Sequence, residues 1–227
     1  MTEKILLFDI DGTMLSSGGS GQQAMEQVLL EQFGVPEIKT EIPSAGRTDR
    51  AIITDLFRDH DIQLNDASFE QFKHAYFRVL PDFLRQKTGC VLNGVVALLN
   101  KLSALPQVKL GLLTGNFREG ARIKLSSFGL DHYFDVGGFG DHHHHRDDVA
   151  REAFRAVQTV CLKEISPSNI WVIGDTPADI ICARAIGAKV MAVCTGVYEA
   201  ELLATHMPDS LVDDLANLEE VSSILLK

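Results

Sequence analysis

The chain has 227 residues, of which 45% are hydrophobic and 23% charged, so it has enough apolar material for the core of a globular protein of one or two domains. Its formal net charge of −10 argues against a nucleic-acid partner, because phosphate backbones bind basic surfaces. No uncharged stretch approaches the ~18 residues of a membrane span, and no signal peptide is recognised. The four cysteines form no C-x-x-C pair, which is typical of reduced thiols. We therefore expect a cytoplasmic protein with neither a membrane nor a nucleic acid as partner, and the sequence leaves the oligomeric state open.

Short apolar runs alternate with amphipathic segments, a pattern typical of a parallel sheet with helical crossovers. The predicted strands are 4–9, 108–113, 133–136, 169–174, 189–194 and 210–213. The helices predicted with them are 93–105, 117–127, 147–162, 177–186 and 215–225. Because the strands are apolar on both faces, helices should cover both sides of the sheet. The predicted fold class is α/β, with a Rossmann-like parallel-sheet core.

The interval between the first two strands breaks this alternation, because it contains no convincing strand. Its helical patterns cover 20–33, 48–59 and 66–87. Ser20 is expected to cap the first of these helices and Gly34 to end it, and Pro81 should bend or break the third.

A crossover between parallel strands needs only a dozen or more residues, so this surplus is interpreted as an inserted all-helical cap subdomain. The predicted division is a core of residues 1–15 and 89–227 and a cap of residues 16–88. The cap would lie over the carboxyl ends of the strands, where open α/β sheets bind ligands.

Acidic side chains follow two of the predicted strands. Asp9 stands at the end of the first strand and Asp11 follows two residues later. Asp175 ends the strand 169–174, and Asp179 lies one helical turn further on, so both can face one spot. Crowded carboxylates raise one another's pKa unless a cation neutralises them, and hard oxygen ligands favour Mg²⁺. The sequence contains no Cys/His cluster of the kind that binds zinc.

Three motifs carry a resemblance to a known family. The stretches "DIDGT", "LLTGN" and "GDTPAD", in this order and spacing, resemble the first, second and fourth motifs of the haloacid dehalogenase-like phosphohydrolases. The resemblance covers essentially the whole chain, including the helical insertion, and the subgroup looks like phosphoglycolate phosphatase and its relatives. It implies a Mg²⁺-dependent phosphatase of small phosphorylated metabolites that works through an aspartyl-phosphate.

The resemblance also implies roles for the acidic residues. Asp9 would be the nucleophile, and Asp11 would protonate the leaving oxygen and then deprotonate the hydrolytic water. Mg²⁺ would be held by Asp9, the backbone carbonyl of Asp11 and Asp175. Asp179 would be a further ligand or an acceptor close to the ion.

The phosphoryl group would be held by the second and third motifs. The second motif supplies the hydroxyl of Thr114 and the backbone amides of Gly115 and Asn116. The third motif of the family is a single Lys or Arg before a helix, and no lysine occurs between residues 124 and 163. Arg146 is therefore the predicted third-motif cation, and Arg151 is a poorer candidate because it lies further into the helix.

Two further stretches have both a structural and a functional interpretation. In "AGRTDRAI", Thr48 or Asp49 could cap a helix, or Arg47 could reach from the cap to the substrate. The run His142–His145 is interpreted as a solvated loop in preference to a metal site, because adjacent histidines cannot easily face one ion.

Three alternative functions remain open at this stage. A phosphomutase would use the same core but return the phosphoryl group to a substrate. A metal-free haloacid dehalogenase shares the fold, although Asp11 argues against it because that reaction needs no second acid. A non-catalytic phosphate-binding protein would need a defective set of motifs. Among phosphatase substrates, phosphoglycolate, a sugar phosphate, a nucleotide and pyrophosphate all remain possible.

Overall fold

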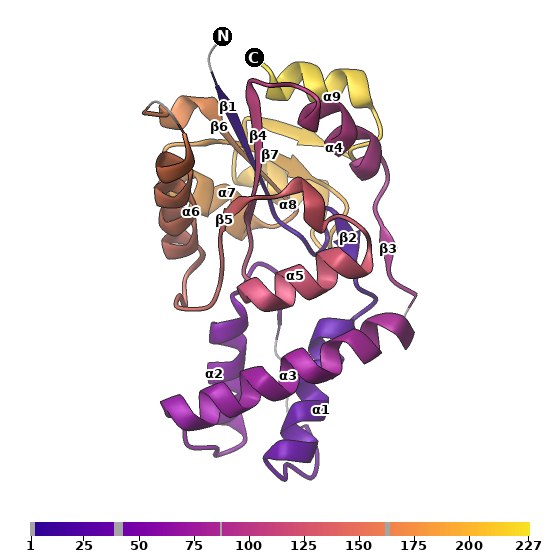
Figure 1. Cartoon of the computed structure of the whole chain (residues 1–227), viewed down its shortest axis with the longest axis vertical. Helices are drawn as coiled ribbons and strands as arrows, with labels where there is room; N and C mark the ends of the chain where they lie inside the picture. The colour runs from indigo at the N-terminus through magenta and orange to yellow at the C-terminus, as the bar shows by residue number, and fades with distance from the viewer. Residues whose placement is uncertain (1–2, 39–42, 87, 162–163) are drawn as a thin grey trace.

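The computed structural model describes residues 3–38, 43–86, 88–161 and 164–227. Within them, six strands form a parallel sheet in the order β5-β4-β1-β6-β7-β8 (Figure 1). These strands are β1 (Lys4–Phe8), β4 (Val108–Leu113), β5 (Val136–Gly138), β6 (Ile170–Gly174), β7 (Lys189–Val193) and β8 (Ser210–Val212). The first strand lies in the middle of the sheet, and all of its side chains are buried. This arrangement confirms the predicted Rossmann-like α/β core.

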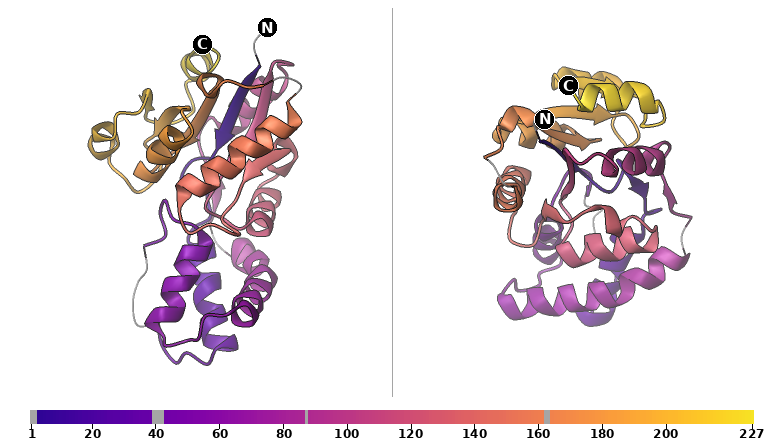
Figure 2. Two further views of the ribbon diagram at one scale, coloured as in Figure 1. Left: turned by 90° about the vertical axis from the view of Figure 1, so that its left-hand side faces the viewer. Right: turned by 45° about the horizontal axis from the view of Figure 1, so that its top comes forward.

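Helices cover both faces of the sheet, as the apolar strands predicted (Figures 1 and 2). One face packs against α4 (Val95–Ser103), α5 (Arg118–Ser127) and α9 (Leu218–Leu225). The other packs against α6 (Arg146–Val160), α7 (Pro177–Ala185) and α8 (Ala200–Thr205). Alternate residues of β1 enter the two cores: Leu6 and Phe8 on one side, Ile5 and Leu7 on the other. Two short 3₁₀ helices, η1 (Asp131–Tyr133) and η2 (Pro167–Asn169), precede β5 and β6.

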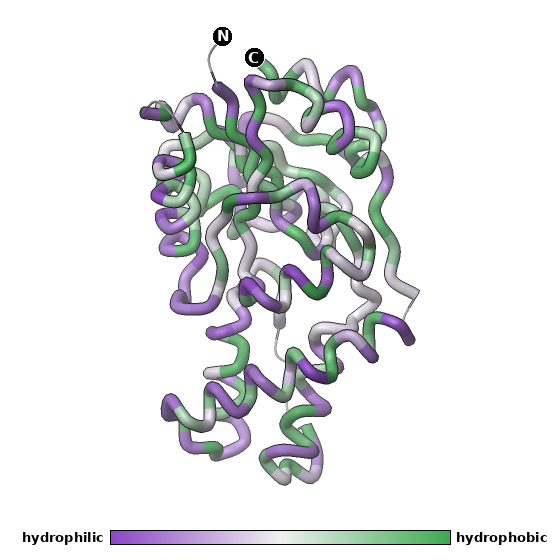
Figure 3. Tube along the Cα trace, in the orientation of Figure 1, coloured by the Kyte–Doolittle hydropathy of each residue, from purple (hydrophilic) through white to green (hydrophobic). Residues whose placement is uncertain are grey.

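Three helices lie beyond one end of the sheet and share a separate apolar cluster (Figures 1 and 2). They are α1 (Ser20–Gln32), α2 (Asp49–Asp59) and α3 (Asp66–Gln86). Apolar and polar stretches alternate along α3, as in an amphipathic helix with one buried face (Figure 3). Strand β2 (Leu15–Ser16), just before α1, pairs antiparallel with β3 (Cys90–Val91), just after α3. This short ladder therefore joins the two chain segments that connect the three helices to the sheet. We retain the division into core (1–15 and 89–227) and cap (16–88) as a proposal that this ladder supports.

Two local expectations were wrong, those at Ser20 and at 133–136, and the break considered at Pro81 does not occur. Gly19, with φ 82°, occupies the N-cap of α1, and the hydroxyl of Ser20 instead donates to the backbone oxygen of Ser17 (2.6 Å). Helix α3 is not broken at Pro81, because the buried side chains of Leu80 and Leu84 fix both sides of it in the apolar cluster.

The strand expected at 133–136 begins only at Val136. Its residues Gly137 and Gly138 carry no β-propensity signal, and a Cβ at Gly138 would overlap the backbone of α6. The sequence patterns also missed α8 and the ladder of β2 with β3. None of the described helices has both the length and the apolar character needed to cross a membrane.

Candidate active site

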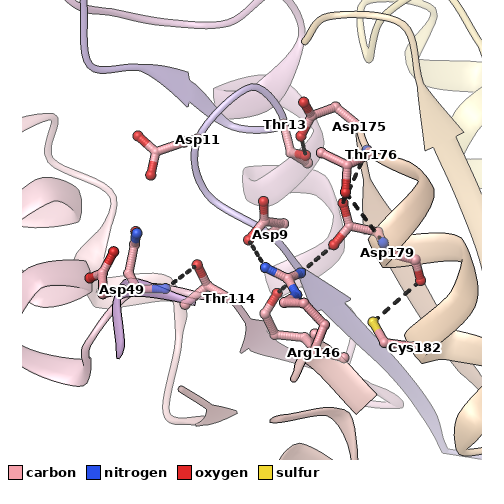
Figure 4. A network of polar contacts seen from close by, with 12 residues as sticks. Asp9, Asp11, Thr13, Asp49, Thr114, Arg146, Asp175, Thr176, Asp179 and Cys182 are labelled. Atoms are coloured by element: carbon pink, nitrogen blue, oxygen red, sulfur yellow. Dashed lines mark hydrogen bonds and ion pairs between the residues drawn. The ribbon is translucent and has the colours of Figure 1, made fainter. Parts of the chain in front are cut away.

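Two acids stand side by side because their strands are neighbours in the sheet. Strand β1 pairs with β6, and Asp9 and Asp175 are the first residues beyond the two strands. The backbone N–H of Asp9 donates to the carbonyl of Ile173 (2.9 Å), which keeps the two chain segments together where they leave the sheet. Asp179 approaches from the first turn of α7 (Figure 4). One carboxylate oxygen from each of these three acids lies within 4.8 Å of the others, and all three residues are buried.

The N-terminus of α6 places Arg146 among these acids (Figure 4). Its guanidinium donates to Asp9 Oδ1 (3.3 Å), to the backbone oxygen of Leu113 (3.1 Å) and to Asp179 Oδ1. Arg146, the predicted third-motif cation, thus contacts Asp9, the predicted nucleophile. We call Asp9, Arg146, Asp175 and Asp179 the strand-end cluster.

Burial and mutual repulsion dominate the electrostatics of the strand-end cluster. Burial raises the pKa of Asp9 to about 7, although Arg146 opposes it, and burial with the charges of Asp179 and Asp9 raises the pKa of Asp175 to about 8. Burial disfavours the Arg146 cation, but Asp179 and Asp9 outweigh it and raise its pKa. Three carboxylates and one guanidinium leave a formal charge of −2 when all are ionised. An all-oxygen donor set with this charge fits a hard divalent cation.

Tight packing fixes the direction of these carboxylates. Gly12 has φ 80°, and a Cβ there or at Gly196 would overlap the carboxylate of Asp175. The Thr13 hydroxyl donates to Asp175 Oδ1 (2.9 Å). Thr176 caps α7, and its N–H and hydroxyl both donate to Asp179 Oδ2 at 3.1 and 2.7 Å.

The loop after β4 carries the residues expected to hold a phosphoryl group. The N–H of Thr114 donates to Gly138 of the neighbouring strand (3.2 Å), and its hydroxyl accepts from Asn116 N–H (3.3 Å). A Cβ at Gly115 would overlap the backbone carbonyl of Arg47. This loop and the start of α2 are therefore in direct backbone contact, which glycine alone permits.

A cavity of about 400 Å³ lies between the sheet and the three helices. All of the predicted site residues line it except Asp179, which is fully buried. The lining residues are Asp9, Asp11, Arg47, Thr114, Gly115, Asn116, Arg146 and Asp175. Arg47 borders the cavity, but its guanidinium pairs with Asp55 of α2. Thr48 caps α2 by accepting from Ala51 N–H (3.1 Å), which agrees with the structural interpretation of this stretch.

The carboxylate of Asp11 has a different environment from that of Asp9. It points away from Asp9 and Arg146 (Figure 4) and pairs with the ammonium of Lys124 on α5. That ammonium also donates to Asn116 Oδ1 (3.2 Å). Asp49, at the start of α2, is buried beside them and accepts from the N–H of Phe117 (2.8 Å). We call Asp11, Asp49, Asn116 and Lys124 the Lys124 cluster.

Sequence reasoning missed Lys124 and Asp49. A signal for Lys124 was present, since it lies between Ala121 and Leu125 on the apolar face of the predicted helix 117–127. A lysine in that position must find buried partners or remain unpaired at high cost. Asp49 carried no comparable signal, because an acid in the first turn of a helix is ordinary.

The histidine run lies outside both clusters. His142, His144 and His145 are exposed, and the ring of His143 is hydrogen-bonded to Glu152 (2.7 Å). The pKa of His144 is lowered by its partial desolvation and by the nearby charges of Arg50 and His145. Within the described residues, the group with the geometry of a metal site consists of Asp9, Asp175 and Asp179, and contains no histidine.

Comparisons with known proteins agree with the fold. The family model described as haloacid dehalogenase-like hydrolase matches residues 6–193. The chain is 28% identical to validoxylamine A 7'-phosphate phosphatase of Streptomyces hygroscopicus subsp. limoneus, over 95% of each chain. It is 26% identical to phosphoglycolate phosphatase of Yersinia pestis, covering 93% of this chain and 89% of the relative. A solved hydrolase from Pseudomonas syringae shares the fold with a TM-score of 0.72 at 20% identity, covering 98% and 99% of the two chains.

The match to the family model covers more than half of the chain, so the protein belongs to the haloacid dehalogenase-like hydrolases. The resemblance drawn from the three sequence motifs is confirmed. The phosphatase names of the relatives confirm the expected class of enzyme, a hydrolase of phosphoric monoesters.

Proposed function

We propose that this protein is a Mg²⁺-dependent phosphatase of small phosphorylated metabolites that works through an aspartyl-phosphate on Asp9. The main supporting observation is that the strand-end cluster, with its excess of negative charge, borders the same cavity as the loop of Thr114, Gly115 and Asn116. The cavity volume of about 400 Å³ suits a small molecule. A cytoplasmic location is part of this proposal.

The residues that would hold Mg²⁺ are Asp9, Asp175 and Asp179, with the backbone carbonyl of Asp11. Their fit to a divalent cation rests on the closeness of the three carboxylates and on the raised pKa values of Asp9 and Asp175, which a bound cation would lower again. When bound, the ion would supply positive charge that offsets the charge of the phosphoryl oxygens.

The chain's own residues would carry two displacements at phosphorus. In the first, an oxygen of Asp9 attacks, the bond to the ester oxygen breaks, and Asp11 gives its proton to that oxygen. In the second, Asp11 takes a proton from water, whose oxygen attacks phosphorus and releases Asp9 and inorganic phosphate. Arg146 and the Thr114 loop would hold the phosphoryl oxygens through both steps, and such positioning is the main source of catalysis in phosphoryl transfer.

The reaction is tested by measuring inorganic phosphate release from a panel of phosphorylated metabolites, with Mg²⁺ and with a chelator. We expect Asp9→Asn to abolish turnover while its circular dichroism and cooperative unfolding stay like those of the wild type. Asp82→Asn, which removes an exposed acid of α3, is the control and should keep full activity.

Other outcomes would identify the alternatives. Isomerised sugar phosphates without phosphate release would indicate a phosphomutase. Turnover that a chelator leaves unchanged would contradict the metal requirement, and wild-type rates in Asp9→Asn would contradict the nucleophile.

A further inference from the structure

Lys124 is a buried cation that the reaction scheme leaves without a role. It lies on α5, outside the family's motifs quoted above, and its side chain is 5% exposed. A buried ammonium is costly unless hydrogen bonds and opposite charges compensate it. Here the Nζ atom donates to Asp11 Oδ2 and to Asn116 Oδ1 (3.2 Å). The surroundings of Lys124 are therefore arranged to hold a positive charge. The main partner of the ammonium is Asp11, the carboxylate expected to transfer the proton.

The location of the cluster suggests what this charge does. Lys124, Asp11 and Asp49 all line the cavity, at the boundary between α5 and the three helices. The ammonium also lies against Gly21 of α1, where a Cβ would stand 3.4 Å from Nζ and 3.5 Å from the hydroxyl of Tyr76. Residues from α1, α2 and α3 thus close around the ammonium on the side opposite the sheet.

Two other roles for Lys124 fit the contacts less well. A third-motif cation should contact Asp9, and that contact is made by Arg146, whereas Lys124 contacts Asp11. A cation that binds an anionic group of the substrate should have free donors facing the cavity. Two of the three donors of Lys124 are instead directed to Asp11 and Asn116, and Asp49 provides a second acidic charge nearby.

We propose that Lys124 is a positioning residue that holds the Asp11 carboxylate in the orientation needed for proton transfer. This inference rests on the proposed phosphatase function. When Asp11 gives its proton to the leaving oxygen, the ammonium stabilises the carboxylate that remains. When Asp11 then takes a proton from water, the same hydrogen bond keeps its other oxygen in place. Lys124 keeps its own protons throughout, so the proton balance is that of Asp11 and the substrate alone.

The dependence of the rate on the leaving group separates this role from the others. An alkyl phosphate needs a proton on its leaving oxygen, whereas p-nitrophenolate leaves readily without one. We expect Lys124→Met to lower kcat for an alkyl phosphate by about 100-fold, the lower end of what a general acid contributes. With p-nitrophenyl phosphate the loss should be at least tenfold smaller. Arg122→Met, which removes an exposed cation from the same helix, is the matched control and should change neither rate.

Two further variants keep the test informative if Lys124→Met does not fold. Lys124→Gln keeps a donor near Asp11 without the charge and should show the same selective loss. Lys124→Arg keeps the charge and should restore part of the alkyl phosphate rate.

The remaining outcomes overturn the proposal. Equal losses with both substrates would indicate a packing role, and a raised KM with unchanged kcat would indicate substrate binding. If the wild type hydrolyses p-nitrophenyl phosphate and Asp9→Asn does not, the proposed function stands whatever Lys124 does. A wild type inactive on every phosphate ester would overturn both.

Discussion

The two polar clusters in the cavity differ in how far their own cations compensate their carboxylates. The strand-end cluster has three buried carboxylates against one guanidinium, so its formal charge is −2 when all four groups are ionised. The Lys124 cluster has two carboxylates, one ammonium and an amide, and its hydrogen bonds are formed without any added ion. The first cluster is thus arranged to bind an added cation. The second already contains a cation, the ammonium of Lys124. This comparison predicts that substitutions in the two clusters will have different effects.

The largest effect on stability should come from Asp179→Ala. Asp179 is fully buried, pairs with Arg146, and accepts two hydrogen bonds from Thr176. Removing it leaves a buried guanidinium with less compensation, so we expect the free energy of unfolding to fall by about 3–5 kcal/mol. Urea denaturation measures this value. Asp82→Asn, which breaks an exposed pair with Arg85, should cost less than about 1 kcal/mol, and similar losses in both variants would contradict the comparison.

In the Lys124 cluster, Asp49 should make stability depend on pH. Burial raises its pKa from 3.8 to about 6, although Lys124 and the N–H of Phe117 oppose that rise. The folded state therefore binds this proton more tightly than the unfolded state does. Its stabilising effect is complete below about pH 4 and is lost as the pH rises through about 6.

Asp49→Asn cannot titrate, and its amide oxygen can still accept from Phe117. Between pH 4 and pH 7 the wild type should lose up to about 3 kcal/mol of unfolding free energy relative to this variant. Denaturation of both proteins across this range measures the difference, in which the strand-end acids largely cancel because both proteins contain them. A difference that stays constant with pH would show that Asp49 does not titrate in this way.

The two clusters also differ in how far the sequence predicted them. Asp9 and Asp175 could be paired in advance, because parallel strands that are neighbours in a sheet end at the same edge. Arg146 was found by elimination, since no lysine was available in its segment. Lys124 and Asp49 meet only because the start of α2 lies against the segment that leads into α5, a tertiary contact that neither helix encodes alone. Residues at strand ends could thus be predicted from the sequence, whereas a cluster formed by residues of two different helices could not.

The same reasoning applies to the fold. The buried strands β1, β4, β6 and β7 were predicted within one residue at each end, because continuous apolar runs specify them. Strand β5 was displaced because two of its three residues are glycines, which leave no hydrophobic pattern: Gly138 lies close to α6 and Gly137 close to Leu112 of β4. The continuation of α3 through Pro81 depends on packing in the apolar cluster shared by α1, α2 and α3. Such packing cannot be predicted from the local sequence.

The smallest of the predicted effects is a loss of Mg²⁺ affinity, which should be confined to substitutions in the strand-end cluster. Asp175→Asn is nearly isosteric, so the close contacts with Gly12 and Gly196 and the hydrogen bond from Thr13 can persist. The variant removes one negative charge from the strand-end cluster and should weaken Mg²⁺ binding by about 10–100-fold, or about 1.4–2.7 kcal/mol. Isothermal titration calorimetry with Mg²⁺ measures this loss directly, without substrate.

Asp49→Asn is the matched control for that measurement, because it also removes one buried carboxylate from the wall of the same cavity. Asp49 lies near the charge of Lys124 and does not belong to the three-acid group, so Mg²⁺ affinity should stay at the wild-type value. Equal weakening by both substitutions would mean that the ion responds to the total charge of the cavity. Weakening by Asp175→Asn alone would mean that the ion is bound by carboxylates in direct contact, as the separation of the two clusters requires.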